Sequence, residues 1–217
     1  MSFEVSLKEL LSFELKSFLG RFFINSTPKL SDHKNYLNLG CGSNIVSGYV
    51  NADFFCSFKP WKKNKRRIEW QLDLRYPLNC GDGVFDGIYS EHTLEHLYPG
   101  QVDALLRELN RVAKENAIIR ISVPDIEKYV NFYNGSGNDI DFDKFQVKYD
   151  SGCSAIRNVT QNYFHVSVWD YSELEKSLKK AGFRDVKRMR CNESRDKFLE
   201  IDIDERSWES LYVEAIK

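Results

Sequence analysis

The chain has 217 residues, of which 42% are hydrophobic and 29% are charged. This length and composition fit one globular domain with a sizeable core and exclude an intrinsically disordered chain. Lysine and arginine number 31 against 32 for aspartate and glutamate, so the chain lacks the basic excess of a general nucleic-acid binder, and nucleic acid is not expected as its partner.

The cysteines and the first residues of the chain indicate the cellular compartment of the protein. Five cysteines are scattered without a Cys-x-x-Cys pair: Cys41, Cys56, Cys80, Cys153 and Cys191. Such a set favours a reducing compartment over a disulfide framework. No apolar run approaches the roughly 20 residues of a transmembrane helix, and the first residues lack the pattern of a signal peptide. These features predict a cytoplasmic protein.

Residues 1–28 are predicted to form an N-terminal amphipathic helix outside the main domain, which spans residues 29–217. Its apolar residues recur at steps of three and four along one helical face: Phe3, Leu7, Leu10, Leu11, Phe18 and Phe22. Three interpretations fit this aromatic-rich face. It can dock on the domain, form a homodimer contact, or lie on a membrane surface as a peripheral contact.

Beyond residue 29, short apolar runs alternate with helical patterns. The runs predict strands at Tyr36–Leu39, Tyr49–Asp53, Ile68–Leu72, Phe85–Tyr89 and Ala117–Val123. Apolar spacing predicts three helices: one that starts at Pro99-Gly100 and runs to Ala113, one that follows Pro124-Asp125, and one that Ser172 opens and Gly182 stops. Two strands are predicted after them, near 183–191 and 207–216. The alternation predicts an α/β fold with a Rossmann-like, doubly wound, mostly parallel sheet and helices on both faces, closed by a C-terminal antiparallel hairpin strand.

Residues 134–165 form a long insertion that is rich in glycine and aromatic residues. A long insertion inside a compact α/β domain is more often a lid or a pocket wall than a plain connector. The alternative is a surface excursion that packs its own aromatic side chains.

The first strand leads directly into Gly40-Cys41-Gly42. Glycines there let the backbone approach a ligand closely, at the carboxyl end of a strand where doubly wound sheets bind ligands. Asp53 ends the next apolar run and can accept hydrogen bonds from both hydroxyls of a ribose. A dinucleotide fingerprint needs a third glycine, where Ile45 stands, and an acid about 20 residues on, so nicotinamide and flavin cofactors are not expected.

Together these motifs resemble those of the class I S-adenosylmethionine-dependent methyltransferases, in particular the predicted methyltransferases of bacterial surface-polysaccharide pathways. The resemblance covers residues 36–217 through segments 38–42, 48–53, 72–75, 85–97, 121–125 and 181–183. It implies S-adenosylmethionine as the cofactor, with Asp53 at its ribose and Asp73 and Leu74 at its adenine. The remaining cofactor residues that it implies are Asn38, Gly40, Cys41, Gly42 and Ser90.

Two features depart from the family pattern. Asn38 stands where the first motif usually begins with an acid, so the charge that would attract the donor's ammonium group is missing. The interval between Gly42 and Asp53 is also too short for a full helix, so a helix-dipole contribution to binding is not expected there.

Histidines are the candidates for removing the acceptor's proton, because imidazole titrates near neutral pH. His92 follows the fourth strand and His165 ends the insertion, so these two are the predicted catalytic residues, whereas His96 is predicted to be structural. Residues 92–96 also spell His-x-x-Glu-His, a zinc-peptidase signature. That chemistry needs a long helix, which Pro99 interrupts, so no metal is expected.

The predicted function is methylation of a small-molecule or glycan-type acceptor at oxygen. One alternative is a catalytically inactive, methyltransferase-like binding or regulatory module, suggested by Asn38 and the short first crossover. Another is an RNA methyltransferase, suggested by the basic run over residues 59–67. The absence of an Asn-Pro-Pro-Tyr-like motif after the fourth strand counts against methylation of a base amine.

Overall fold

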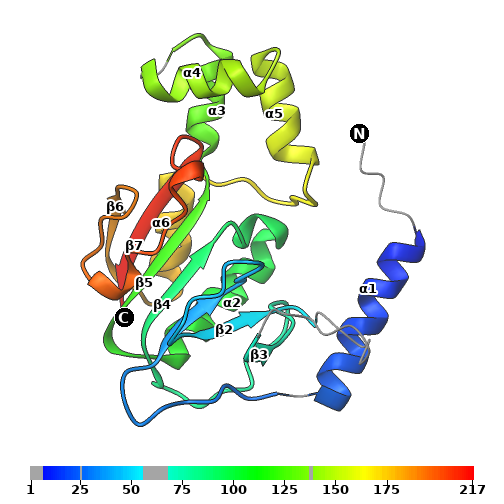
Figure 1. Cartoon of the computed structure of the whole chain (residues 1–217), viewed down its shortest axis with the longest axis vertical. Helices are drawn as coiled ribbons and strands as arrows, with labels where there is room; N and C mark the ends of the chain where they lie inside the picture. Colours follow the sequence, from blue (N-terminus) through cyan, green and yellow to red (C-terminus); the bar gives the residue numbers. More distant parts are fainter. Residues whose placement is uncertain (1–6, 25, 56–67, 137–138) are drawn as a thin grey trace.

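The computed structural model describes residues 7–24, 26–55, 68–136 and 139–217. Phe3 and the basic run over residues 59–67 lie outside the described residues. Seven described strands form one sheet in the order β3-β2-β1-β4-β5-β7-β6 (Figure 1). They are β1 Tyr36–Leu39, β2 Val50–Asp53, β3 Trp70–Gln71, β4 Phe85–Glu91, β5 Ala113–Pro124, β6 Arg184–Met189 and β7 Ser210–Ile216.

The strand directions confirm the predicted fold class. Strands β1 to β5 pair in parallel, whereas β7 runs antiparallel to both β5 and β6. No helix separates β1 from β2, as the short interval between them predicts. The carboxyl ends of β1, β2 and β4 therefore meet at one edge, where a doubly wound sheet binds its ligand.

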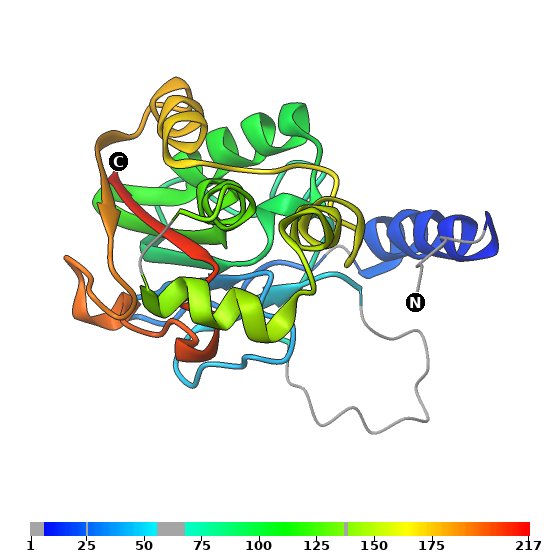
Figure 2. The same ribbon diagram turned by 90° about the horizontal axis from the view of Figure 1, so that it is seen from above.

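Two helices, α2 (Pro99–Val112) and α6 (Tyr171–Lys180), cover one face of the sheet (Figure 2). Alternation along the strands turns Leu37, Leu39 and Ile88 into the core beneath them. The opposite face carries a smaller aromatic cluster in which Leu199, from the segment between β6 and β7, packs on Tyr36 and Tyr89. Helices were predicted on both faces of the sheet. On this opposite face, the segment between β6 and β7 takes the place where a helix was predicted.

The insertion is mostly helical. With the preceding α3 (Ile126–Tyr133), it forms a helical cap of residues 126–161 that stands above the sheet (Figure 1), and its other helices are α4 (Asp139–Lys148) and α5 (Gly152–Gln161). The cap has its own core of Tyr129, Phe145, Tyr149, Ala155 and Val159. The insertion therefore packs its own aromatic side chains, and its last residue, His165, also lines the larger cavity described below.

Helix α1 (Leu7–Leu19) continues as a π-turn over Gly20–Ile24 and lies beside the β3 edge (Figures 1 and 2). Its contacts are mainly polar: the Ser17 hydroxyl donates to Asp73 at 2.5 Å, and Glu14 accepts from Arg75 at 2.6 Å. The Phe13 ring also stacks on Phe54 with centroids 4.4 Å apart.

The apolar face of α1 is exposed, so it does not make the docking contact that one of the three interpretations expects. It consists of Leu7, Leu10, Leu11, Phe18 and Phe22, each at least half exposed. The domain surface beneath α1 presents a carboxylate and a guanidinium, so the serine side of the helix turns inward. Within the described residues, no helix combines the length and apolar character required to cross a membrane.

Candidate active site

A cavity of about 170 Å³ lies at the carboxyl end of β1. Its walls are the turn after β1, the end of β4, and the segment before β7, with the lining residues Asn38, Gly40, Cys41, Gly42, Ser43, Asn44, Tyr89, Glu91, His92, Ile203 and Arg206. The backbone has positive φ at Gly40 (67°) and Gly42 (52°), a conformation that glycine adopts without steric cost. A Cβ at Gly42 would meet no atom within 4 Å, so this turn leaves room for a ligand against its backbone.

Two amide side chains brace the turn. The Asn38 side chain donates to Asn44 O at 2.8 Å and to Asn51 Oδ1 at 2.9 Å, and Asn51 Oδ1 also accepts from Val46 N. An aspartate at position 38 could not donate these hydrogen bonds. The Asn38 amide therefore holds the turn in place through its hydrogen bonds and carries no charge.

Asp53 lies beside the same turn. Its Oδ2 accepts from Gly42 N at 2.5 Å and its Oδ1 accepts from Phe54 N at 2.6 Å. A carboxylate has about four acceptor positions, so both oxygens keep capacity for further donors.

Glu91 lines this cavity, and the sequence analysis did not select it. Its side chain is nearly buried and accepts from Ile203 N at 3.2 Å. Burial raises the pKa of Glu91, and the hydrogen bond from Ile203 opposes this effect. Ser90, the predicted cofactor residue, is buried and does not line the cavity. Strand alternation was the available signal, since Tyr89 and Glu91 share a face that Ser90 does not.

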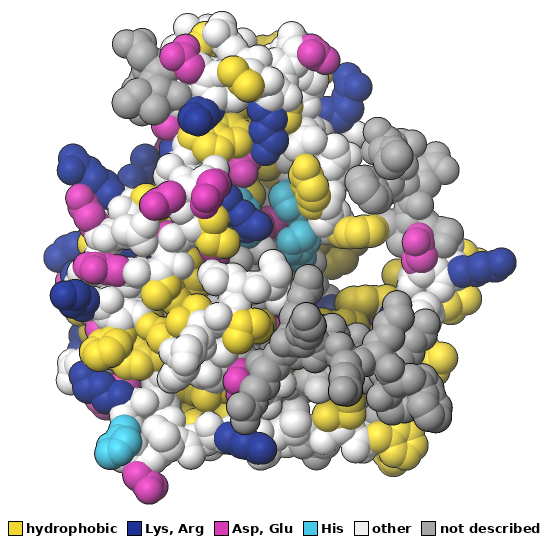
Figure 3. All heavy atoms as spheres, in the orientation of Figure 1, with side chains coloured by type: hydrophobic (Ala, Val, Ile, Leu, Met, Phe, Trp, Pro, Cys, Tyr) yellow, Lys and Arg dark blue, Asp and Glu magenta, His cyan; other side chains and the backbone are white. Residues whose placement is uncertain are grey.

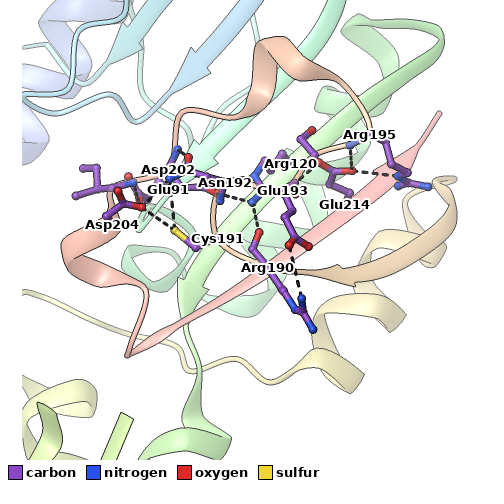
Figure 4. A network of polar contacts seen from close by, with 12 residues as sticks. Glu91, Arg120, Arg190, Cys191, Asn192, Glu193, Arg195, Asp202, Asp204 and Glu214 are labelled. Carbon is purple, nitrogen blue, oxygen red and sulfur yellow. Dashed lines mark hydrogen bonds and ion pairs between the residues drawn. The ribbon is translucent and has the colours of Figure 1, made fainter. Parts of the chain in front are cut away.

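The segment between β6 and β7 is held in place by a buried ion-pair network (Figure 4). Arg120 of β5 is fully buried; its guanidinium bonds both oxygens of Asp202 and, at 3.1 Å, Glu214 Oε1. It also donates to Glu193 O and Arg190 O, each at 2.8 Å. This network fixes the segment that carries Ile203 and Arg206 to the cavity.

A larger cavity of about 510 Å³ opens between the sheet edge and the helical cap. Figure 3 shows histidine side chains gathered in a hollow between these two parts. Residues from the sheet edge, the cap and the segment before β7 line it: His92, Glu95, His96, Pro124, Tyr129, Lys148, Asn158, Val159, Tyr163, Phe164, His165, Arg206 and Glu209. His92 and Arg206 line both cavities, so the two cavities adjoin at these side chains.

His92 is held at both ring nitrogens. Nε2 lies 2.7 Å from Ser210 Oγ, and Nδ1 lies 3.4 Å from Glu95 Oε1. Its backbone has a positive φ of 47°, which is uncommon for a residue with a Cβ and is found often at functional sites. Burial lowers the pKa of His92 to about 3, so its imidazole is neutral at pH 7.

His165 is anchored at one nitrogen only. Its Nδ1 lies 2.8 Å from Val159 O, and because a carbonyl oxygen can only accept, Nδ1 carries the proton. The neutral ring then has its lone pair on Nε2. Burial lowers the pKa of His165, which favours this neutral form. The Glu95 carbonyl accepts from Val166 N at 2.8 Å, and this contact brings the end of the insertion to the turn after β4.

The structure thus brings the two predicted catalytic histidines to one cavity, and it brings Asn38, Gly40, Cys41 and Gly42 to the adjoining one. Asp53, Asp73 and Leu74 line neither cavity, although Asp53 bonds the glycine turn that lines the smaller one. Asp73 is buried under α1 and bonded by Ser17 and Arg75, and Leu74 packs against the core.

Comparison with known proteins identifies a matching family. A family model described as a methyltransferase domain matches residues 9–188. A search of curated proteins finds no match.

Solved structures share the fold. A S-adenosylmethionine-dependent methyltransferase from Thermotoga maritima aligns with a TM-score of 0.51 and 12% identity, over 97% of this chain and 93% of that one. The apo methyltransferase SibL aligns with a TM-score of 0.51 and 16% identity, over 98% of this chain and 60% of that one.

Proposed function

The chain belongs to the methyltransferase-domain family and is an S-adenosylmethionine-dependent methyltransferase, and we propose that it methylates an oxygen of a small or glycan-type acceptor. The supporting observation is that the two cavities adjoin at His92 and Arg206. A donor in the smaller cavity would present its methyl group to an acceptor in the larger one.

The residues around the smaller cavity fit the donor. S-adenosylmethionine supplies a methyl group on a sulfonium, so the chain's main task is to position the two substrates. We assign the backbone of Gly40, Cys41 and Gly42 to close contact with the donor and Asp53 to its ribose hydroxyls. We assign Glu91, which lines the same cavity as Asn38, to the donor's ammonium group, for which the Asn38 amide offers no charge.

Arg206 is the complementary cation. Arg206 lines both cavities, and among the described residues its guanidinium donates no hydrogen bond that would hold it away from a ligand. A guanidinium binds a carboxylate through two parallel hydrogen bonds. We assign Arg206 to the carboxylate of the donor's methionine part.

Asp73 and Leu74 remain proposed adenine contacts, and Ser90 remains a proposed donor contact. An adenine at Asp73 would have to displace the Ser17 hydroxyl, since Ser17 donates to Asp73 at 2.5 Å. Adenine binding at Asp73 would therefore compete with the contact that holds α1 on the domain.

We assign removal of the acceptor's proton to His165, and His92 is the second candidate for this base. His165 has an unprotonated Nε2 at the acceptor cavity, whereas both His92 nitrogens already have partners. Residues 134–165 are proposed to act as a lid on the acceptor, because the cap and His165 form one wall of that cavity.

Replacing Asp53 with alanine tests the donor site. Loss of the carboxylate leaves the ribose hydroxyls without an acceptor, which costs about 1–3 kcal/mol, or roughly 5- to 150-fold in the Kd of S-adenosylhomocysteine. Isothermal titration calorimetry measures that Kd. The matched control is Asp143→Ala, an exposed aspartate of α4, far in the chain from the glycine turn that Asp53 bonds.

Wild-type protein that binds no S-adenosylhomocysteine would refute the donor site. Acceptors are then screened by formation of S-adenosylhomocysteine from the donor with free sugars, sugar phosphates and nucleotide sugars. Donor binding without turnover on any acceptor class would favour the inactive binding module.

The exposed face of α1 is proposed as a peripheral contact with an anionic membrane or with a second copy of the chain. Deleting residues 1–24 should abolish sedimentation with anionic vesicles if the face binds lipid, or convert a dimer to a monomer in light scattering if it pairs. A smaller change, Leu11→Ser with Phe18→Ser, should give the same loss while it keeps the Ser17 contact. Full-length protein that neither sediments nor dimerises would contradict both assignments.

The cytoplasmic location and the role in surface-polysaccharide synthesis are also proposals. The first is supported by four cysteines that form no disulfide: Cys41, Cys80, Cys153 and Cys191. The second rests on the motif resemblance.

A further inference from the structure

Glu95 is a buried acid without a hydrogen-bond partner. Its side chain is about 2% exposed, and neither carboxylate oxygen accepts a hydrogen bond from the described residues. Burying an unsatisfied carboxyl group is costly, and native proteins usually supply such a group with a donor or a cation. The nearest ring nitrogens are Nδ1 of His92 at 3.4 Å and Nε2 of His165 at 3.9 Å.

Three metal-ligating side chains converge at this acid. Ligand atoms of Glu95, His96 and His165 all lie within 4.8 Å of one another, and the rings of His96 and His165 have centroids 4.9 Å apart. In a tetrahedral zinc site, metal–ligand distances near 2 Å put the ligand atoms about 3.3 Å apart. Side-chain rotations that move each atom by about 1 Å would bring this set around one ion.

The hydrogen bonds around the cluster suit metal binding. A histidine that binds a metal generally donates its other ring N–H to a carbonyl or a carboxylate. His165 does so, since Nδ1–H donates to Val159 O and leaves Nε2 toward Glu95. Consecutive positive φ angles at Tyr163 (60°) and Phe164 (62°) lead the chain into this position. Such backbone strain is found mostly at functional sites.

We propose that Glu95, His96 and His165 bind one divalent transition-metal ion, for which Zn²⁺ is the best fit. Two imidazoles and one carboxylate form a ligand set that zinc enzymes use, with a fourth position open. All three residues line the larger cavity, so the open position faces the space assigned to the acceptor.

The ion and a proton compete for the same Nε2 lone pair. His165 can therefore serve as the base only in the metal-free chain. With the ion bound, an acceptor hydroxyl at the open position would bind through its oxygen, which lowers the hydroxyl's pKa and lets its proton pass to solvent water.

The metal site is tested on the full-length chain after treatment with a chelator. Calorimetric titration with Zn²⁺ should give one equivalent per chain. Glu95→Gln and His165→Asn should each weaken binding by about 100-fold or more, and His92→Asn, which removes a group that orients Glu95, by about 10- to 100-fold. His33→Asn is the matched control, because His33 is exposed and precedes β1. Co²⁺ should produce the visible absorption of a tetrahedral site in the wild type and not in Glu95→Gln.

Failure to bind one equivalent of Zn²⁺, or equal affinity in the ligand variants and in His33→Asn, would overturn the proposal. Circular dichroism and S-adenosylhomocysteine affinity of the metal-free variants report whether they fold. The metal site does not depend on the proposed donor site, since S-adenosylhomocysteine affinity of the metal-free wild type tests the donor site separately.

Discussion

Replacing Arg120 with methionine is expected to destabilise the fold by about 3–5 kcal/mol, because the buried Asp202 carboxylate loses its cation, whereas Glu214 keeps Arg195. The side chains of Arg120, Asp202 and Glu214 are all fully buried. Two backbone carbonyls, Glu193 O and Arg190 O, would also lose their donor. Chemical denaturation followed by circular dichroism measures the change in the free energy of unfolding.

Arg188→Met is the matched control for this effect. Arg188 is about half exposed and pairs with Glu127 at 2.6 Å, so its loss should cost at most about 1 kcal/mol. Adding Asp202→Asn to Arg120→Met should recover part of the stability, because the remaining buried charge becomes an amide. Equal stabilities of Arg120→Met and Arg188→Met would contradict the role of the network.

The network also bears on the donor site. It holds the segment that brings Ile203 and Arg206 to the smaller cavity, where Ile203 N donates to Glu91. A folded Arg120→Met protein should therefore bind S-adenosylhomocysteine more weakly than Arg188→Met does. The free energy of unfolding and the affinity for the donor are therefore linked through the segment between β6 and β7.

Replacing His165 with asparagine in the chelator-treated chain is expected to lower turnover by about two to four orders of magnitude, the usual contribution of a general base. Donor affinity should remain unchanged, since His165 lines the larger cavity and not the smaller one. Initial rates of methyl transfer, measured with an acceptor from the screen, test this expectation alongside calorimetry with S-adenosylhomocysteine.

The pH profile separates a base from a structural residue. Because burial lowers the pKa of His165 below 6.5, its imidazole stays unprotonated at neutral pH, and the rate should fall only as the pH drops through that lowered pKa. This acid limb should be absent in His165→Asn and present in His33→Asn. Full activity of both His165→Asn and His92→Asn would rule out a histidine base. The rate would then come only from the positioning of the donor and the acceptor.

Much of the fold could be predicted because its signals are local. The run Tyr36–Leu39 coincides with β1, and apolar spacing placed α3 at its observed bounds. The Gly40-Cys41-Gly42 turn follows from the same local pattern, since only glycine adopts its positive φ angles without strain. Family order then placed these elements in a sheet that the strand pairing confirms.

Other parts of the site depended on contacts between distant segments. His165 meets Glu95 because residues 166 and 167 bond the Glu95 carbonyl, and no periodicity encodes that pairing. Arg206 reaches both cavities through a segment held by Arg120, which is 86 positions earlier in the chain. The side of α1 that turns inward was likewise decided by the polar surface that it contacts. Its own apolar pattern would have predicted the opposite side.

By itself, the sequence determined which residues form strands and helices, where the glycine turn lies, and that an α/β sheet would place this turn at a ligand-binding edge. Only the tertiary structure decided that His96 and the buried Glu95 lie at the cavity that His92 and His165 share, and that Glu91 faces the smaller cavity. The reason is physical: propensity and periodicity act within a few residues, whereas a cavity is bounded by side chains whose positions depend on the packing of segments far apart in the chain.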